Sequence, residues 1–198
     1  MYKRILATAV ALTLIFSMQC GIYAEENTIR RDELANKIMD CYEYVTQEFS
    51  APLFEQPVFN DINDSLFGYR ILQCYAAGFM DGVGDKKFEP TLAVTKSQAA
   101  VALYRLVSKL NAKYDIVQAE EPLVINDLYT APIWASNSIE YMVLNGFMPL
   151  DNGKFYPNDE ISETELDGII ERIKDIFVLD DERERIDFET FLTKVQRG

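Results

Sequence analysis

The side chains that most often perform catalysis are unevenly represented in this chain. It has no histidine, which excludes Ser–His and Cys–His catalytic pairs and most zinc sites. Its 32 aspartates and glutamates supply many carboxylates, and two acids at a suitable separation can hydrolyse a glycosidic bond. Because no pair of acids stands out by its motif, we expect a protein that is not an enzyme and that has no cofactor.

Two other groups of side chains have the chemistry for a site. Asp81 and Asp85 lie in a loop of turn-forming residues, but the regular spacing of a calcium-binding loop is missing there, so we predict no metal site. Cys41 and Cys74 lie among apolar residues within expected helices. We expect two buried free thiols, with a disulfide as the alternative in an oxidising compartment.

The elements that would position these groups follow one ordered set of landmarks, which occurs twice. The first copy reads Phe59-Asn60-Asp61-Ile62, Phe67, Gly78-Phe79-Met80, Lys87-Phe88-x-Pro90 and Val94-Thr95-Lys96-Ser97-Gln98. The second copy reads Ile125-Asn126-Asp127-Leu128, Trp134, Gly146-Phe147-Met148, Lys154-Phe155-x-Pro157 and Ile161-Ser162-Glu163-Thr164-Glu165. Repetition of this length marks a stacked, modular architecture and argues against one catalytic pocket.

Half of a further copy precedes these two. Ile29-Arg30-Arg31-Asp32-Glu33 stands where the later copies have their last landmark, and an amphipathic stretch follows it. We therefore divide the chain into a partial first repeat at 25–56, a second repeat at 57–110 and a third repeat at 123–177. The segments 50–57 and 111–124 are expected to connect the repeats.

Each full repeat is predicted to be a helix, a tight loop and a second helix, which makes the protein all-α. Apolar residues recur at helical spacing over 66–77 and 133–145, and Gly78 and Gly146 are placed to end those helices. The second helices are expected at 96–110 and 163–177, with a helix of the half repeat at 30–47. Thr95 with Gln98, and Ser162 with Glu165, have the spacing of capping boxes.

The two ends of the chain carry other signals. Residues 1–24 combine a basic start, an apolar run and a small-residue cleavage site, which is typical of a secretory signal peptide. An uncleaved anchor, or a lipoprotein modified at Cys20, is the alternative. After cleavage no membrane span is expected. The segment 180–198 reads as a charged tail, in which 187–195 fits a short helix that would cover apolar surface left by the missing half repeat.

The order of these landmarks resembles that of S-layer homology (SLH) domains. The family pattern is F-x-D, an aromatic before a helix, G-[IF], D-G, F-x-P, and I-T-R-x-E at the next helix. Residues 59–106 and 125–173 resemble it closely, and 29–49 resembles its last third. The resemblance implies tandem repeats packed as a pseudo-threefold, three-lobed helical body.

The resemblance also implies a function. Such modules hold secreted proteins at the bacterial cell wall and cell surface without a covalent bond, by binding pyruvylated secondary cell-wall polysaccharide in grooves between lobes. The family's cation falls on Arg31 and Lys96 here, whereas Glu163 reverses the charge in the last copy. A cation beside the free amides of a helix start would attract a ketal carboxylate. Phe67 and Trp134 would stack on a sugar, and Thr95 lies beside Lys96 in the same motif.

Several departures keep other interpretations open. Arg31 and Lys96 would otherwise be solvated charges at helix starts, and Trp134 an aromatic packed between lobes. The net charge of −13 disfavours nucleic acid and does not favour an acidic polymer. The alternative function is therefore a degenerate SLH module that binds another protein of the envelope. A second copy of the chain could also complete the half repeat.

Overall fold

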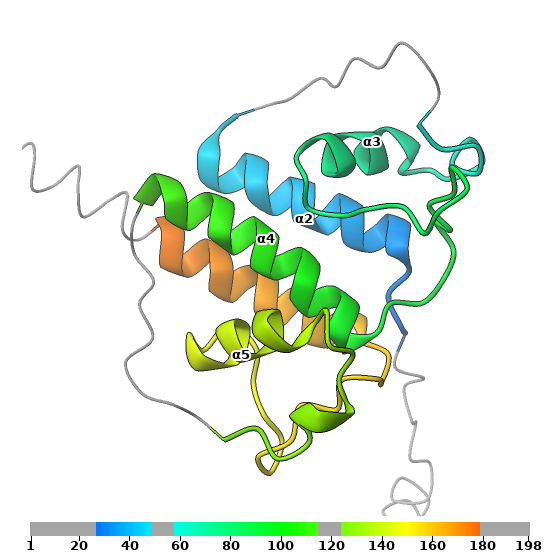
Figure 1. The fold of residues 1–198 in the computed structure, drawn as a ribbon. Coiled ribbons are helices and arrows are strands. Elements are labelled where there is room, and N and C mark those ends of the chain that lie inside the picture. Colours follow the sequence, from blue (N-terminus) through cyan, green and yellow to red (C-terminus); the bar gives the residue numbers. More distant parts are fainter. Residues whose placement is uncertain (1–26, 49–57, 115–123, 179–198) are drawn as a thin grey trace, which may run out of the picture.

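The fold is helical, as the sequence predicts. A computed structural model describes residues 27–48, 58–114 and 124–178 (Figure 1). The elements in chain order are α2 (Arg31–Thr46), α3 (Gly68–Ala76), α4 (Lys96–Tyr114), the 3-10 turn η1 (Leu128–Thr130), α5 (Ser136–Leu144) and a helix at 163–178. Within these ranges the only β pairing consists of isolated bridges, so the all-α prediction is confirmed.

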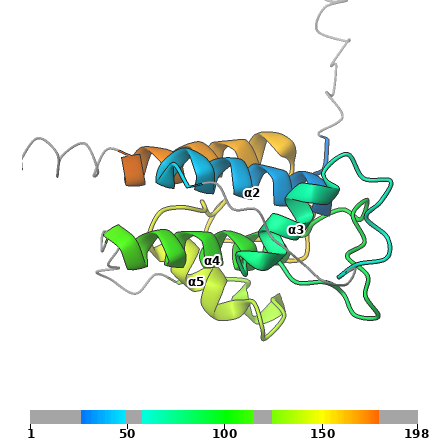
Figure 2. The ribbon, with the colours of Figure 1, turned by 90° about the horizontal axis from the view of Figure 1, so that it is seen from above.

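The three long helices form the centre of the molecule. In both views α2, α4 and helix 163–178 lie side by side (Figures 1 and 2). The short helix α3 packs against α2, and α5 packs against α4. Each short helix therefore lies on the long helix of the repeat before it, which ties neighbouring repeats into one hydrophobic core.

The starts of the three long helices are joined by backbone hydrogen bonds. Ile29 N donates to Ile161 O at 3.1 Å, Ile161 N donates to Val94 O at 2.9 Å, and Val94 N donates to Ile29 O at 2.9 Å. These residues occupy the same position in the three copies, and all three are buried. The hydrogen bonds form a closed ring, so each repeat, including the half repeat, satisfies the backbone of another.

The aspartate of the F-x-D or I-x-D landmark has the same structural role in both full copies. The Asp61 carboxylate accepts from Phe88 N at 2.9 Å and from Glu89 N at 2.8 Å. Asp127 does the same for Phe155 N and Tyr156 N, both at 2.8 Å. The segment before the first helix of each repeat is thereby fastened to the loop that follows this helix, because the carboxylate satisfies two loop amides.

We predict that Asp61→Asn lowers stability in a way that depends on pH. Burial raises the pKa of Asp61, but the N–H groups of Phe88 and Glu89 outweigh it and hold the pKa below its usual value. The carboxylate therefore stabilises the fold above the ordinary aspartate pKa of about 4, and this stabilisation is lost as the pH falls through the lowered pKa. Urea unfolding at pH 7 should show a loss of about 1–2 kcal/mol.

The same comparison repeated at progressively lower pH supplies the control. The difference between the original protein and Asp61→Asn should shrink in acid, because both then lack the charge. A difference that stayed constant between pH 7 and pH 2 would contradict this account of Asp61.

The observed helix bounds follow the expected ones closely at the glycines. Gly78 and Gly146 have φ of 79° and 71°, the left-handed conformation that ends a helix and that glycine adopts without strain. The long helix α4 continues to Tyr114, so the second connector does not begin at 111 as predicted. The predicted signal peptide, the connector 50–57 and the tail 180–198 lie outside the described residues.

The outward side of helix 163–178 is polar. Its exposed residues are Glu163, Thr164, Asp167, Gly168, Glu171, Arg172 and Asp175. On α4, Tyr104 makes an edge contact with Tyr141 of α5. The equivalent residue of helix 163–178 is Glu171, which is exposed. The short helix expected at 187–195 lies outside the described residues, so its cover of an apolar surface stays a prediction.

The two cysteines of the described region are free and fully buried. Burial raises the pKa of both Cys41 and Cys74 to about 12, so neither forms a thiolate at ordinary pH. We predict that a thiol reagent at pH 8 leaves both residues unmodified in the folded protein and modifies them at once in 8 M urea. Peptide mass mapping measures each site separately, and rapid labelling without urea would contradict the buried positions.

Candidate functional site

Arg31 is a buried cation between two repeats. It is 6% exposed, and its Nε donates to Phe88 O at 2.8 Å while its Nη2 donates to Asp81 O at 2.9 Å. The guanidinium also lies 4.6 Å from the centre of the Phe88 ring. Burial lowers the pKa of Arg31, and nearby acids, Glu89 first, partly offset this. Arg31 is thus not a solvated charge, and its hydrogen bonds go to carbonyl groups.

Arg31 lines a cleft of about 280 Å³ to which all three repeats contribute. The second repeat supplies the loop 79–83 and one side of α4, and the third supplies Trp134. The residues that line it are Arg31, Phe79, Met80, Asp81, Gly82, Val83, Gln98, Val101, Ala102, Arg105 and Trp134. The cleft therefore brings together a cation and an aromatic ring that the sequence singled out 103 positions apart.

A second cation lies in the same cleft. Arg105 Nη1 is 2.7 Å from Asp81 Oδ2 and donates to Phe79 O at 3.4 Å. Arg105 and Arg31 both bind the residue Asp81, one through its carboxylate and the other through its carbonyl. The two arginines and one carboxylate leave the cleft with an excess of positive charge in a chain that is acidic overall.

Trp134 stands at the edge of this cleft and is 61% exposed. This exposure contradicts the alternative in which the ring packs between lobes. An exposed indole beside a charged cleft presents an apolar face with low conformational freedom, which suits stacking on a flat ligand surface. Neighbouring Ile133 is 95% exposed and does not line the cleft.

The structure places Lys96 and Thr95 in different surroundings. Lys96 Nζ forms an ion pair with Glu165 Oε1 at 2.9 Å, and its side chain is 19% exposed. Thr95 caps α4: its Oγ1 accepts from Gln98 N at 3.3 Å, and its own N–H donates to Gln98 Oε1 at 3.0 Å. The predicted capping box is present, and neither residue lines the cleft of Arg31.

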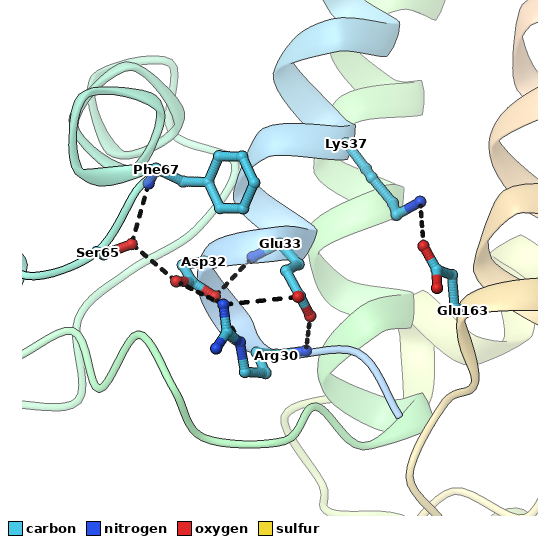
Figure 3. Close-up of polar contacts among 7 residues, drawn as sticks. All are labelled: Arg30, Asp32, Glu33, Lys37, Ser65, Phe67 and Glu163. Atoms are coloured by element: carbon cyan, nitrogen blue, oxygen red, sulfur yellow. Dashed lines mark hydrogen bonds and ion pairs between the residues drawn. The ribbon is translucent and has the colours of Figure 1, made fainter. Parts of the chain in front are cut away.

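In the third repeat Glu163 stands at the position of the family's cation. It forms an ion pair with a lysine of the first repeat. Lys37 Nζ lies 3.3 Å from Glu163 Oε1 (Figure 3). It also lies 2.6 Å from Asp167 Oδ1. Burial alone would lower the pKa of Lys37, but the hydrogen bonds to the two acids raise it overall. The reversed charge is therefore part of a surface contact between α2 and helix 163–178, and not a free acid.

Phe67 is half-buried at the start of α3, away from the cleft of Arg31. Its N–H donates to Ser65 Oγ at 3.1 Å, and Ser65 Oγ donates to Asp32 Oδ2 at 2.7 Å (Figure 3). Asp32 is almost fully buried and also accepts from Arg30 Nη2 at 3.3 Å. These contacts fix the start of α3 on the start of α2.

A wider cleft of about 680 Å³ lies beside this network. Its lining consists of Arg30, Asp32, Asp61, Asp64, Ser65, Leu66, Lys87, Glu89, Pro90, Thr91 and Leu92. Four carboxylates face two cations there, so its charge opposes an anionic ligand. We therefore take the smaller cleft as the candidate site for an anion.

The helix starts themselves do not offer free amides. Arg31 N donates to Leu92 O and Asp32 N donates to Pro90 O, both at 3.0 Å. Lys96 N and Ser97 N donate in the same way to carbonyls of the next F-x-P segment. The expectation that unpaired amides attract an anion is wrong at these helices, because the neighbouring repeat satisfies them. Attraction in the cleft must come from the guanidinium groups.

Sequence reasoning missed Arg105 and Gln98 as parts of this cleft. A signal for Arg105 was present, because Arg172 stands at the same place in the next copy and donates to Phe147 O as Arg105 does to Phe79 O. Each arginine comes almost three helical turns after the capping residue of its helix, beyond the stretch that the landmarks covered. Each arginine donates to the equivalent loop carbonyl of its own repeat, so part of its role is structural.

The described part of the chain shows neither a metal-binding cluster nor a membrane-spanning helix. No group of three or more Cys, Asp or Glu residues there is arranged to hold a metal ion. None of the helices in 27–48, 58–114 and 124–178 combines the length and the apolar character needed to cross a bilayer.

The comparison with protein families decides the identity of the central region. Residues 58–100 match the family model of the S-layer homology domain. The chain contains an S-layer homology domain. The matched segment runs from the residue before Phe59 through α3 and the 79–92 loop to the first turn of α4. A search of curated proteins found no match.

This finding gives the chain a general role. S-layer homology domains are binding modules that anchor proteins at the cell wall or cell envelope, and they are not catalytic domains. The matched segment supplies the loop 79–83 and Gln98, which line the cleft of Arg31. The candidate site therefore lies at the edge of the S-layer homology domain, where its neighbours on both sides complete it.

Proposed function

We propose that the cleft between Arg31 and Trp134 binds the acidic, pyruvylated end of a secondary cell-wall polysaccharide. Binding there would retain a small secreted protein at the bacterial cell surface without a covalent bond and without catalysis. The observation that carries this proposal is that the cleft joins two arginines to an exposed indole, although its parts come from three repeats.

The chemistry of the cleft fits an acidic sugar in two ways. A ketal carboxylate would be attracted by Arg31 and Arg105, and the low-dielectric surroundings of the buried Arg31 strengthen that attraction. The face of a pyranose ring is apolar enough to lie on Trp134. A neutral glycan would use only the second contact, so the proposal predicts selectivity for the acidic form.

The architecture supports the same proposal. The ring formed by Ile29, Val94 and Ile161 places three equivalent helix starts around one point. We propose that the repeats are arranged about this ring as a pseudo-threefold body with grooves between its lobes. The signal peptide at 1–24 would deliver the chain to the envelope. No nucleic acid or membrane lipid is required as a partner.

The experiment is co-sedimentation of the purified protein, residues 25–198, with isolated cell-wall sacculi. It is carried out before and after removal of the non-peptidoglycan polysaccharide, and again after mild acid has hydrolysed the pyruvyl ketals. We expect sedimentation with native sacculi only. Equal sedimentation with all three preparations would refute recognition of the acidic polysaccharide.

Matched variants locate the site in the same assay. Arg105→Gln removes a cleft cation and should reduce sedimentation, whereas Lys109→Gln, one turn further along α4 and outside the cleft lining, should not. Circular dichroism confirms that each variant is folded. If folded protein fails to sediment with any sacculi, a protein partner in the envelope becomes the preferred function.

A further inference from the structure

The three long helices offer three equivalent positions for a cleft of this kind, and they differ in their side chains. The first consists of Arg31, the loop 79–83, the α4 residues Gln98 and Arg105, and Trp134. The equivalents at the second and third positions follow from the alignment of the repeats at Ile29, Val94 and Ile161, the residues of the hydrogen-bonded ring.

At the second position the cation that takes the place of Arg31 is paired with an acid. Lys96 stands in the place of Arg31, and Glu165 stands in the place of Gln98. Their ion pair of 2.9 Å contrasts with Arg31, whose hydrogen bonds go to two uncharged carbonyls. An incoming carboxylate at Lys96 would have to displace Glu165 or lie beside it, and a like charge so close is unfavourable.

The walls of the second position differ as well. Pro149-Leu150 replace the Asp81-Gly82 pair of the loop, so the carboxylate that orients Arg105 has no equivalent there. The aromatic residue that would face this position belongs to the front half of the first repeat, which has no landmark sequence in this chain. Arg105 of the first position does have an equivalent at the second position. This is Arg172, which donates to Phe147 O.

At the third position acids replace every cation. Glu163 stands in the place of Arg31, Glu33 in the place of Gln98, and Asp40 in the place of Arg105. Lys37 is near Glu163 but is held by both Glu163 and Asp167. The aromatic equivalent to Trp134 for this position in the sequence is the half-buried Phe67, and no F-x-P loop precedes α2 in the sequence.

We propose that the chain binds one acidic glycan terminus and no more, because, of the three equivalent positions in the described residues, only the cleft of Arg31, Arg105 and Trp134 has all of its parts. This inference rests on the proposed function. A monovalent attachment exchanges much faster than one held at two sites, since a second linked contact would raise the overall affinity by about 10²–10⁴-fold. The protein would accordingly move between glycan chains and would not be fixed to one.

The test is isothermal titration of residues 25–198 with the pyruvylated oligosaccharide released from sacculi. We expect one equivalent of oligosaccharide per chain. Arg105→Gln should weaken binding about tenfold, which corresponds to about 1.4 kcal/mol. The matched variant Arg172→Gln, which removes the equivalent arginine of the next copy, and Lys96→Gln should each leave the affinity within about twofold of the original.

The outcomes separate this inference from the proposed function. A stoichiometry of two or more would overturn the monovalent attachment and leave glycan binding intact. Weakening by Arg172→Gln or Lys96→Gln equal to that by Arg105→Gln would also overturn it. If folded protein shows no binding to the oligosaccharide at all, the proposed function fails and the monovalent attachment fails with it.

Discussion

Trp134→Ala should abolish most of the retention of this protein on cell-wall sacculi while leaving its fold intact. An exposed aromatic at the edge of a charged cleft is the kind of residue that carries a large share of a binding free energy, often about 2 kcal/mol or more. The affinity for the polysaccharide is expected to fall by at least about tenfold, measured as the protein concentration that half-saturates the sacculi.

Ile133→Ala is the matched control for this prediction. Ile133 is adjacent in sequence, apolar and even more exposed, but it does not line the cleft. Both substitutions should change the free energy of unfolding by less than about 0.5–1 kcal/mol, because neither side chain is packed in the core. Equal loss of binding in the two variants would show that general surface hydrophobicity, and not the cleft, retains the protein.

Arg31→Met should destabilise the fold by about 3 kcal/mol, the largest effect that we expect from any single change of a charged residue. Arg31 makes charged hydrogen bonds to Phe88 O and Asp81 O, each worth about 1.5–3 kcal/mol, and its removal leaves a buried carbonyl without a donor. The contact with the Phe88 ring is lost as well. Urea unfolding followed by circular dichroism measures the change.

Arg105→Met serves as the comparison. Arg105 also bonds to the 79–81 segment, but its side chain is more than one-third exposed and its partner carboxylate is more exposed still. Its loss should cost about 1 kcal/mol or less. A destabilisation by Arg31→Met that did not exceed that of Arg105→Met would mean that the buried contacts of Arg31 contribute little.

The difference between these two arginines has a practical consequence. Loss of wall binding in an Arg31 variant would be ambiguous, because the loop 79–88 that forms the cleft depends on Arg31 for its position. Trp134 and Arg105 test the ligand contact more directly, since Trp134 is exposed and Arg105 is partly exposed. Arg31 therefore has two roles, because it positions the loop of the cleft and also supplies positive charge to the cleft.

The helices and their ends could be predicted from sequence because their signals are local. Gly78 and Gly146 end their helices in the left-handed conformation, and the capping box of Thr95 and Gln98 is formed as expected. Apolar spacing placed the long helices to within a few residues, apart from the C-terminal end of α4, where no glycine or proline stops it before Tyr114.

The candidate site was only partly predictable, because its members are chosen by contacts between repeats. Equivalent positions in the sequence suggested equivalent roles for Arg31, Lys96, Phe67 and Trp134. The structure separates them: Arg31 and Trp134 share a cleft, Lys96 is paired with Glu165, and Phe67 lies at the start of α3. Each position has the same local motif but faces a different neighbour.

The sequence by itself determined the repeat, the all-helical class and the resemblance to S-layer homology domains, since all three depend on the order and spacing of residues along the chain. Only the tertiary structure decided which cations are neutralised and which are not. The physical reason is that the partner of a charge is fixed by packing between segments distant in sequence. Glu165 forms an ion pair with Lys96, whereas Arg31 donates to carbonyl groups of the 79–88 loop and lies over the Phe88 ring.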